Sequence, residues 1–374
     1  MKTRAAICWG ENTDWSVEEV ELRDPGPGEV LVKLAFAGLC HSDEHVRLGD
    51  LSVPDGEGGY LASATPMVGG HEGAGVVEAV GEGVTKVAVG DHVSASFIPS
   101  CGSCHYCSTG RQNLCDRGAE TMSAEPRITA ADGTKVPGMA GLGTFAEHMV
   151  VDQDSLVKVG DWYPLDAVAL VSCGVATGYG SATNVADIRP GDTVVIVGVG
   201  GIGMNAVQGA KAAGAAQIIA VDPVEMKREF AQTVGATHTA ASIEEATPMV
   251  ADLSWGRGAD AVILTVGDAT SDLFAPSMAM VGKGGDMVLT SLSHITQNEI
   301  SLNTFDLAMS QKTLKGNVFG GCNPRADIPA LLRQYEAGQI RLDELITQRY
   351  SLDEINQGYA DMHAGKNVRG VIVF

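Results

Sequence analysis

The second half of the chain alternates apolar, β-branched runs with helix-length segments. Residues 193–198 read TVVIVG and precede a helical stretch at 201–213, and residues 217–222 read QIIAVD and precede one at 224–234. Two later runs, DAVILTV and GDMVLTSL, continue the alternation. Nearly continuous apolar strands joined by helices are typical of a parallel sheet that is covered on both faces. The pattern predicts an α/β fold with a doubly wound domain.

A glycine run, GVGGIG, stands between the first of these strands and its helix. In that context we expect Gly198 to form a tight turn, Gly200 to admit a pyrophosphate and Gly203 to pack the helix against the strand. Gly201 and Ile202 lie at the helix start, where free N–H groups attract phosphate. The run therefore predicts a dinucleotide site.

Asp222 ends the next strand, about 20 residues after the glycine run, where a carboxylate can accept both hydroxyls of an adenosine ribose. Its charge repels a 2′-phosphate, which favours NAD over NADP. The alternative is that Asp222 only caps the helix that follows it.

The first part of the chain consists of short apolar segments separated by turn residues. Candidate strands at 29–37, 75–80 and 91–97 are divided by DPGPGE, GEGV and VGD, which is typical of an antiparallel, barrel-like domain. A chain of 374 residues is expected to form two domains. Two late helical stretches and the strand GVIVF return the chain to the first domain. We therefore expect domains at 1–173 with 323–374, and at 174–322.

Four cysteines, Cys101, Cys104, Cys107 and Cys115, lie within CGSCHYCSTGRQNLC. Thiolates at this spacing can enclose one ion in a tetrahedral Cys₄ zinc site that leaves no position open, so its role is structural. We place this lobe at about residues 99–118. Iron–sulfur ligation is the main alternative, and a cluster of free thiols is a weaker one.

Three more distant residues suggest a second metal site. Cys40 in CHSDEH, His71 in GGHEG and Cys173 in SCG would give a Cys₂His zinc with a fourth position free for water or substrate. Taken singly, each is a weak signal, because a lone cysteine or histidine is more often an ordinary buried residue.

The formal net charge of −21 argues against nucleic acid or an anionic membrane as a partner. The N-terminal residues contain no apolar run that resembles a signal sequence. We therefore expect a soluble, cytoplasmic protein.

Six motifs in order, GLCHSDEH, GGHEGAGVV, the four-cysteine lobe, CGVATGYGSA, VGVGGIG and LKGNVFGG, resemble the zinc-dependent medium-chain alcohol dehydrogenases over essentially the whole chain. The resemblance implies a GroES-like β-barrel catalytic domain, a Rossmann cofactor domain, two zinc ions per chain and NAD. It implies that alcohols are oxidised to aldehydes or ketones, reversibly, by hydride transfer.

The resemblance also implies roles for single residues. Cys40, His71 and Cys173 match the catalytic zinc ligands, with Glu72 beside the metal and Asp43 orienting the histidine. Ser42 and His45 match a proton relay, although His45 could also be a helix-surface residue. Positions matching cofactor contacts are His41, Thr177, Lys227, Asn317, Phe319 and Arg369. Phe97 and Met139 match substrate-pocket positions or are ordinary core residues.

More loosely, the chain looks like the actinobacterial nicotinoprotein branch, whose members keep NAD bound and re-oxidise it with an external electron acceptor. Two alternatives remain. One is a thiol-adduct-dependent formaldehyde dehydrogenase, and the other is a non-catalytic, cofactor-binding redox sensor.

Two further expectations come from the resemblance. The loop between the relay and His71, residues 47–70, is longer than in most of the family. A homo-oligomer is expected, paired through an edge strand near Met287–Leu292 or Asn317–Phe319.

Overall fold

A computed structural model describes residues 1–52 and 65–374 and divides the chain into two compact units. The first unit comprises Met1–Cys173, Asn323–Ala337 and Leu342–Phe374, and the second comprises Gly174–Cys322 and Gly338–Arg341. The short segment 338–341 thus belongs to the second unit, although the sequence placed it in the first. Residues 53–64 of the long loop lie outside the described residues.

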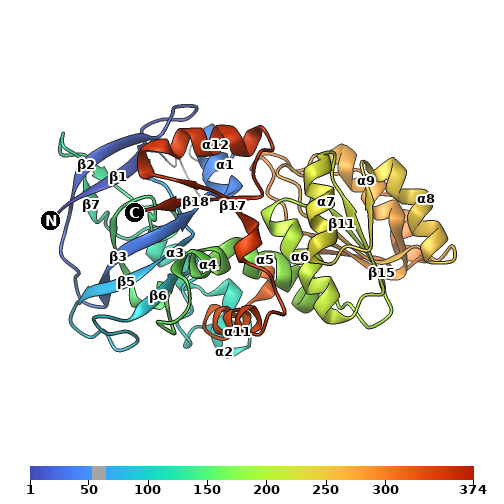
Figure 1. Ribbon diagram of the computed structural model, residues 1–374, viewed down its shortest axis with the longest axis horizontal. Helices are drawn as coiled ribbons and strands as arrows, with labels where there is room; N and C mark the ends of the chain where they lie inside the picture. Colours follow the sequence, from blue (N-terminus) through green and yellow to red (C-terminus); the bar gives the residue numbers. More distant parts are fainter. Residues whose placement is uncertain (53–64) are drawn as a thin grey trace. The chain divides into compact units, whose positions relative to one another are not determined.

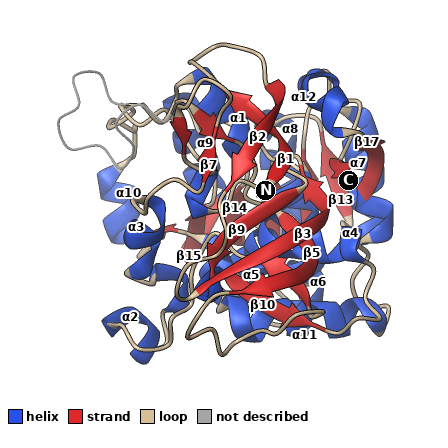
Figure 2. Cartoon of the chain, turned by 90° about the vertical axis from the view of Figure 1, so that its left-hand side faces the viewer, coloured by secondary structure: helices blue, strands red, loops and turns tan. Residues whose placement is uncertain are grey.

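The first unit is built on two mainly antiparallel sheets, in the orders β4-β1-β2-β7-β8 and β10-β6-β5-β3-β18-β17, with β9 also paired to β3. Its strands are β1 (Lys2–Cys8), β2 (Ser16–Leu22), β3 (Glu29–Gly38), β4 (Met67–Val68), β5 (Gly73–Val80), β6 (His92–Ala95), β7 (Ile128–Thr129), β8 (Lys135–Val136), β9 (His148–Asp152), β10 (Leu156–Val159), β17 (Ile346–Tyr350) and β18 (Arg369–Val373). Figure 2 shows β3, β5 and β9 running side by side through this unit.

The helices of the first unit lie around these sheets. They are α1 (His41–Leu48), α2 (His105–Ser108), α3 (Arg117–Met122), α4 (Leu165–Leu170), α11 (Pro324–Glu336) and α12 (Ile355–His363). The long strand β3 buries Val30, Val32 and Leu34 in one apolar core, because alternate residues of a strand face the same side. It delivers the chain to Cys40 and α1 at its end.

The second unit is a six-stranded, wholly parallel sheet in the order β13-β12-β11-β14-β15-β16. Its strands are β11 (Thr193–Val197), β12 (Gln217–Val221), β13 (His238–Ala240), β14 (Ala259–Leu264), β15 (Val281–Leu289) and β16 (Thr313–Gly316). Its helices are α5 (Ala176–Gly180), α6 (Gly201–Ala213), α7 (Glu225–Val234), α8 (Ile243–Leu253), α9 (Ser271–Met280) and α10 (Thr304–Met309), several of them labelled in Figure 1. All five residues of β11 are buried, as expected for a strand covered on both faces.

The predicted positions of the exposed edge strand, near Met287–Leu292 or Asn317–Phe319, are wrong. Strand β15 lies inside the sheet, between β14 and β16, so Met287 is not at an edge. The edge on this side is β16, which ends at Gly316, and Asn317 and Phe319 lie just beyond it. The predicted strand at Asn317–Phe319 is therefore placed too far along the chain, because the β-structure of LKGNVFGG ends at Gly316.

Among the described residues, one helical stretch, Leu165–Val185, is long and apolar enough to cross a membrane. However, 83% of its apolar 18-residue window is buried inside the protein. That burial is typical of a core helix.

Candidate metal and cofactor sites

Cys40, His71, Glu72 and Cys173 form a buried cluster in the first unit, with one potential ligand atom from each lying within 4.8 Å of the others. Cys40 occupies the N-cap position of α1, two residues after the end of β3. His71 and Glu72 lie in the short link between β4 and β5. Cys173 lies in the π-helical turn that continues α4. Residues separated by more than a hundred positions are thus brought to one point.

Two glycines allow the histidine-bearing link to pass close to its neighbours. Gly70 has φ +90, and a Cβ atom there would lie 2.4 Å from Thr144 Oγ1 and 2.6 Å from Phe145 N. A Cβ on Gly69 would lie 2.5 Å from the Trp15 ring. In return, Thr144 N donates to Gly70 O at 2.9 Å and Phe145 N donates to Gly69 O at 2.9 Å. Both positions therefore require glycine for space, and Gly70 requires it for its conformation as well.

Asp43 lies behind the histidine. Its Oδ1 accepts a hydrogen bond from Gly70 N at 2.8 Å, and its Oδ2 lies 3.2 Å from His71 Nδ1. The side chain of Asp43 is fully buried. A carboxylate at Nδ1 leaves Nε2 as the nitrogen that can bind a metal, which is the usual support for a histidine ligand.

The titratable groups of this cluster strongly perturb one another. A hydrogen bond from the Cys173 thiol holds the pKa of Cys40 well below its usual value, and the same bond, with burial, raises the pKa of Cys173. Burial alone would lower the pKa of His71, but the charges of Asp43 and Cys40 raise it well above its usual value. So dense a set of anionic groups in a buried place calls for a cation.

Glu72 is also fully buried, and burial raises its pKa to about 7 although Arg369 acts in the opposite direction. The Arg369 guanidinium donates through Nη2 to Glu72 Oε2. The resemblance placed Arg369 among the cofactor contacts, and in the structure its Nη2 donates to the carboxylate beside the metal cluster.

Two sulfurs and one imidazole are the ligands that zinc prefers, and three protein ligands with one further position is the arrangement of catalytic zinc sites. The shared proton between the two cysteines is what would be displaced when a metal binds two thiolates. The donor set therefore fits zinc.

The relay candidates lie on α1. Ser42 Oγ lies 3.7 Å from Cys40 Sγ. His45 Nδ1 lies 2.7 Å from Asp50 Oδ2, and the imidazole is only 11% exposed, so the helix-surface alternative is wrong. Asp50 was missed by the sequence analysis, although a carboxylate five residues after a relay histidine was a usable signal. His41 is exposed at the start of α1.

The two candidate pocket residues differ in their surroundings. The Phe97 ring packs edge-on against the His71 ring, with centroids 5.6 Å apart. Met139 packs with Val46 and Met67 in a small apolar cluster that includes a residue of α1. Phe97 therefore contacts the metal cluster directly.

Cys101, Cys104, Cys107 and Cys115 form the second cluster, again with all sulfurs within 4.8 Å of one another. Cys101 and Cys107 are 3.9 Å apart, as are Cys104 and Cys115, which is too far for a disulfide. A tetrahedron with zinc–sulfur bonds of about 2.3 Å has edges of about 3.8 Å. The spacing fits a single ion better than a polynuclear cluster, whose sulfurs would be spread over several metal atoms.

Charged residues fix this lobe to the first unit. Arg117 pairs with Asp152 at 2.6 Å and also with Asp154. Arg325, from α11, donates through Nε to Ser100 O at 2.8 Å. The sequence analysis missed these residues because they are far apart along the chain and match no motif.

The glycine turn of the second unit is shaped as the sequence predicts. Gly198 has φ +86, and a Cβ on Gly203 would lie 2.0 Å from Gly198 O. A Cβ on Gly200 would have open space around it, so a ligand can approach there. Helix α6 begins at Gly201, with Gly200 as its N-cap and Ile202 in its first turn. This cradle fits a pyrophosphate.

Asp222 follows β12 and accepts hydrogen bonds from Val199 N at 3.0 Å and Val224 N at 2.9 Å. Val224, not Asp222, is the N-cap of α7, so the simple helix-cap alternative is wrong. Lys227 lies in the first turn of α7. Thr177 is buried in α5, and Phe319 is buried at the start of the 3₁₀ turn Phe319–Gly321.

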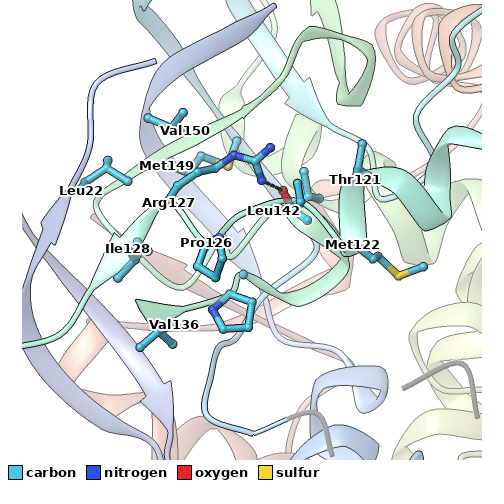
Figure 3. A pocket seen from close by; sticks show the side chains of 14 residues that line it. Leu22, Thr121, Met122, Pro126, Arg127, Ile128, Val136, Leu142, Met149 and Val150 are labelled. Carbon is cyan, nitrogen blue, oxygen red and sulfur yellow. Dashed lines mark hydrogen bonds between the residues drawn. The ribbon is translucent and has the colours of Figure 1, made fainter. Parts of the chain in front are cut away.

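A small cavity in the first unit lies apart from both clusters (Figure 3). It is lined mainly by apolar side chains, and Arg127 donates to Gly141 O at its edge. Figure 3 shows Leu22, Ile128, Val136 and Val150 around it. No predicted ligand or relay residue lines it.

Both units match families of known proteins. Residues 26–161 match the alcohol dehydrogenase GroES-like domain, and residues 201–337 match the zinc-binding dehydrogenase family. The chain is 49% identical to the NDMA-dependent alcohol dehydrogenase of Amycolatopsis methanolica, with 100% of this chain and 99% of that protein covered. The crystal structure of benzyl alcohol dehydrogenase from Acinetobacter calcoaceticus matches with a TM-score of 0.88 at 29% identity, covering 100% and 99%.

A GroES-like domain joined to a doubly wound domain defines the class, and the predicted fold class is confirmed. The chain belongs to the zinc-binding alcohol dehydrogenase family. It is 37% identical to S-(hydroxymethyl)glutathione dehydrogenase of Komagataella pastoris, with 100% of this chain and 97% of that protein covered. The formaldehyde alternative thus has the more distant relative, and membership of an enzyme family argues against a non-catalytic redox sensor.

Proposed function

We propose that this chain oxidises small alcohols to aldehydes or ketones, reversibly, with two zinc ions and NAD. The observation that carries the proposal is the buried cluster of Cys40, His71 and Cys173, whose ligand atoms lie within 4.8 Å of one another beside Glu72. A zinc ion held by these residues supplies Lewis-acid stabilisation of the negative charge that develops on the alcohol oxygen. NAD supplies the hydride acceptor.

Residues of α1 remove the proton from the alcohol in this proposal. Ser42, next to the Cys40 sulfur, accepts the hydroxyl proton as it gives up its own, and His45 passes that proton towards solvent. Asp50 Oδ2 lies 2.7 Å from His45 Nδ1, so it orients the imidazole ring that carries the proton. Ser42 and His45 are three positions apart on the helix and therefore share a face.

The surrounding side chains position the reacting groups and exclude water. Asp43 holds the His71 ring through Nδ1, and Arg369 holds Glu72 beside the thiolates. Phe97, packed on His71, provides an apolar wall for the substrate. Arg369 also offsets part of the negative charge that the cluster concentrates in a buried place.

The second unit binds the cofactor in this proposal. The turn around Gly200 and the start of α6 receive the pyrophosphate, and Asp222 with Lys227 receives the adenosine ribose. The carboxylate of Asp222 is the reason for preferring NAD to NADP. The four-cysteine cluster holds the second zinc, which fixes the lobe and takes no part in the reaction.

The likeness to an NDMA-dependent relative supports a finer proposal, that NAD stays bound through turnover and an external acceptor re-oxidises it. A cytoplasmic location belongs to the same proposal and is supported by eight cysteines that are all free of disulfides.

The experiment is to denature the purified protein and measure zinc and NAD in the supernatant. Two zinc ions and one NAD per chain after gel filtration support the proposal in full. NAD that exchanges freely during turnover would return the chain to the ordinary dehydrogenases. A single zinc, with the Cys40 thiol open to alkylation, would remove the catalytic site.

A further inference from the structure

Arg325, in the first turn of α11, is bound by backbone carbonyl groups next to the four-cysteine cluster. Its Nε donates to Ser100 O at 2.8 Å. Its Nη2 donates to Asp154 O at 3.2 Å, and its Nη1 donates to Leu156 O at 3.4 Å. All three acceptors are neutral. The carboxylate oxygen Asp154 Oδ1 is 3.6 Å from Nη2, too far for a hydrogen bond, and Lys86 already donates to it. A partly buried guanidinium held in this way gains from a further counter-charge.

The four-cysteine cluster can supply that counter-charge. Burial lowers the pKa of Arg325. The negative charges of Asp154, Cys101 and Cys107 act in the opposite direction and favour the charged guanidinium. Two of the four sulfurs are therefore within electrostatic reach of Arg325. Four thiolates around one zinc ion keep a net negative charge, because a divalent ion offsets only two of them. A fixed guanidinium beside the cluster stabilises that excess charge.

Ser100 connects the cluster to the start of α11. It is buried and directly precedes Cys101. Its carbonyl accepts from Arg325, and its Oγ donates to Asn323 Oδ1 at 3.4 Å. Asn323 is the N-cap of α11, and the same Oδ1 accepts from Arg325 N at 3.2 Å. The beginning of α11 is thus bound twice to the residue that a metal-bound Cys101 would hold in place.

These contacts lie where the chain returns to the first unit. The long segment of the second unit ends at Cys322, and the first unit resumes at Asn323. A lobe that folds around a metal loses its order when the metal leaves, because binding and folding are coupled. Ser100 then no longer offers its carbonyl and hydroxyl in fixed positions. Loss of the metal should therefore affect α11 as well as the lobe.

We propose that Arg325 is a positioning residue through which a metal ion in the four-cysteine cluster fastens the start of α11, where the chain returns to the first unit. The inference rests on the proposed function, since it requires zinc in this cluster, and it gives that zinc a role outside its own lobe. With the ion bound, Arg325 has both its carbonyl acceptor at Ser100 and its counter-charge at the sulfurs. Because such coupling is reciprocal, loss of the guanidinium also weakens the hold on the ion.

The first test follows the loss of zinc from the lobe of the full, zinc-loaded chain. EDTA and iodoacetamide are added together, and alkylation is followed peptide by peptide at the four lobe cysteines, which separates them from the catalytic site. In Arg325→Gln these cysteines should be alkylated roughly three- to tenfold faster, the effect of one charged contact discounted for a side chain that is 31% exposed. Arg325→Lys, which keeps the charge but not the three carbonyl bonds, should lie between the two. Arg333→Gln is the matched control, because Arg333 is an exposed arginine of the same helix, and it should not change the rate.

The second test measures the helix itself by amide hydrogen exchange in the first two turns of α11. Cys104→Ser, which removes a ligand of the lobe zinc, should speed this exchange roughly tenfold and leave α6 of the second unit unchanged. Arg325→Gln should have a similar effect, and the double variant should show no more than either single variant, because both changes break one connection. If Cys104→Ser does not fold, the same peptides are compared in unaltered protein before and after EDTA has removed the lobe zinc.

The outcomes separate this inference from the proposed function. Equal alkylation rates in Arg325→Gln and Arg333→Gln overturn the inference while leaving the zinc assignment intact. Exchange in α11 that does not respond to loss of the lobe zinc does the same. An unaltered protein whose lobe holds no zinc overturns the two-zinc part of the proposed function itself.

Discussion

Replacing Asp43 by asparagine tests whether the buried carboxylate behind His71 supports a metal ligand. The substitution is nearly isosteric, and the asparagine oxygen can still accept the hydrogen bond from Gly70 N that Oδ1 now accepts at 2.8 Å. The amide NH₂ would face the N–H on His71 Nδ1, which now lies 3.2 Å from Oδ2. Two donors would then oppose each other, and the histidine would lose its negatively charged partner.

The structure sets the size of the effect. Only one charged contact is lost, and a charge-assisted hydrogen bond, the upper limit for such a contact, contributes about 1.5–3 kcal/mol. That free energy corresponds to a zinc dissociation constant roughly 10- to 150-fold higher at the catalytic site. Loss of a carboxylate that supports a histidine ligand commonly has a similar effect, about 10- to 100-fold.

The assay is competition with a chromogenic chelator, which resolves the catalytic zinc from the more firmly enclosed Cys₄ zinc. Asp286→Asn is the matched control, because Asp286 is a buried carboxylate of the second unit that pairs with Lys315 at 2.6 Å. It should leave zinc affinity unchanged. A change of less than threefold in Asp43→Asn, in a protein of unaltered circular dichroism, would refute the role assigned to Asp43.

Three further outcomes are expected. His45→Gln should slow alcohol oxidation at neutral pH and recover partly at higher pH, and an unchanged pH–rate profile would exclude His45 from the proton path. Burial alone would raise the pKa of Glu29, but hydrogen bonds from Arg23, Gly26 and Arg127 lower it to about 2. Since that is below the unfolded value, Glu29→Gln should cost about 2–3 kcal/mol of unfolding free energy above pH 4.5, a difference that shrinks as the pH falls towards 2 in urea titrations. Cys104→Ser should leave one zinc per chain and lower the thermal midpoint, and retention of two zinc ions by elemental analysis would contradict the Cys₄ assignment.

Local sequence was sufficient for the central strands of the second unit, β11, β12 and β14, because nearly all of their residues are buried. After Thr193 the run TVVIV is wholly apolar, so nothing obscures the assignment, and the expected helix at 201–213 coincides with α6. The prediction of a strand at Asn317–Phe319 was wrong because this segment lies beyond the edge strand of the sheet, where burial does not fix the backbone. At an edge strand few neighbours constrain the backbone, and the turn that begins at Phe319, whose own φ is +55, ends the pairing early.

In the candidate metal cluster, too, some residues could be predicted from the sequence and others could not. Cysteines and a histidine are rare enough in their motifs for Cys40, His71 and Cys173 to be proposed together from sequence. The sequence does not show which charged side chains lie around these ligands and pair with one another. Glu72 and Arg369 pair directly although 297 residues separate them, and Asp43 reaches His71 from a different element.

That balance gives the physical reason for expecting a metal at all. Two thiolates and two carboxylates cannot all be ionised in a buried place whose cations are one guanidinium and the protonated His71 ring, because an uncompensated buried anion is far more costly than a protonated one. Without a further cation the cluster must therefore retain protons, one of them shared between Cys40 and Cys173 and one held by Glu72 near pH 7. A divalent ion replaces those protons, so zinc binding should release protons into the buffer, and its affinity should rise with pH across the range in which Glu72 titrates.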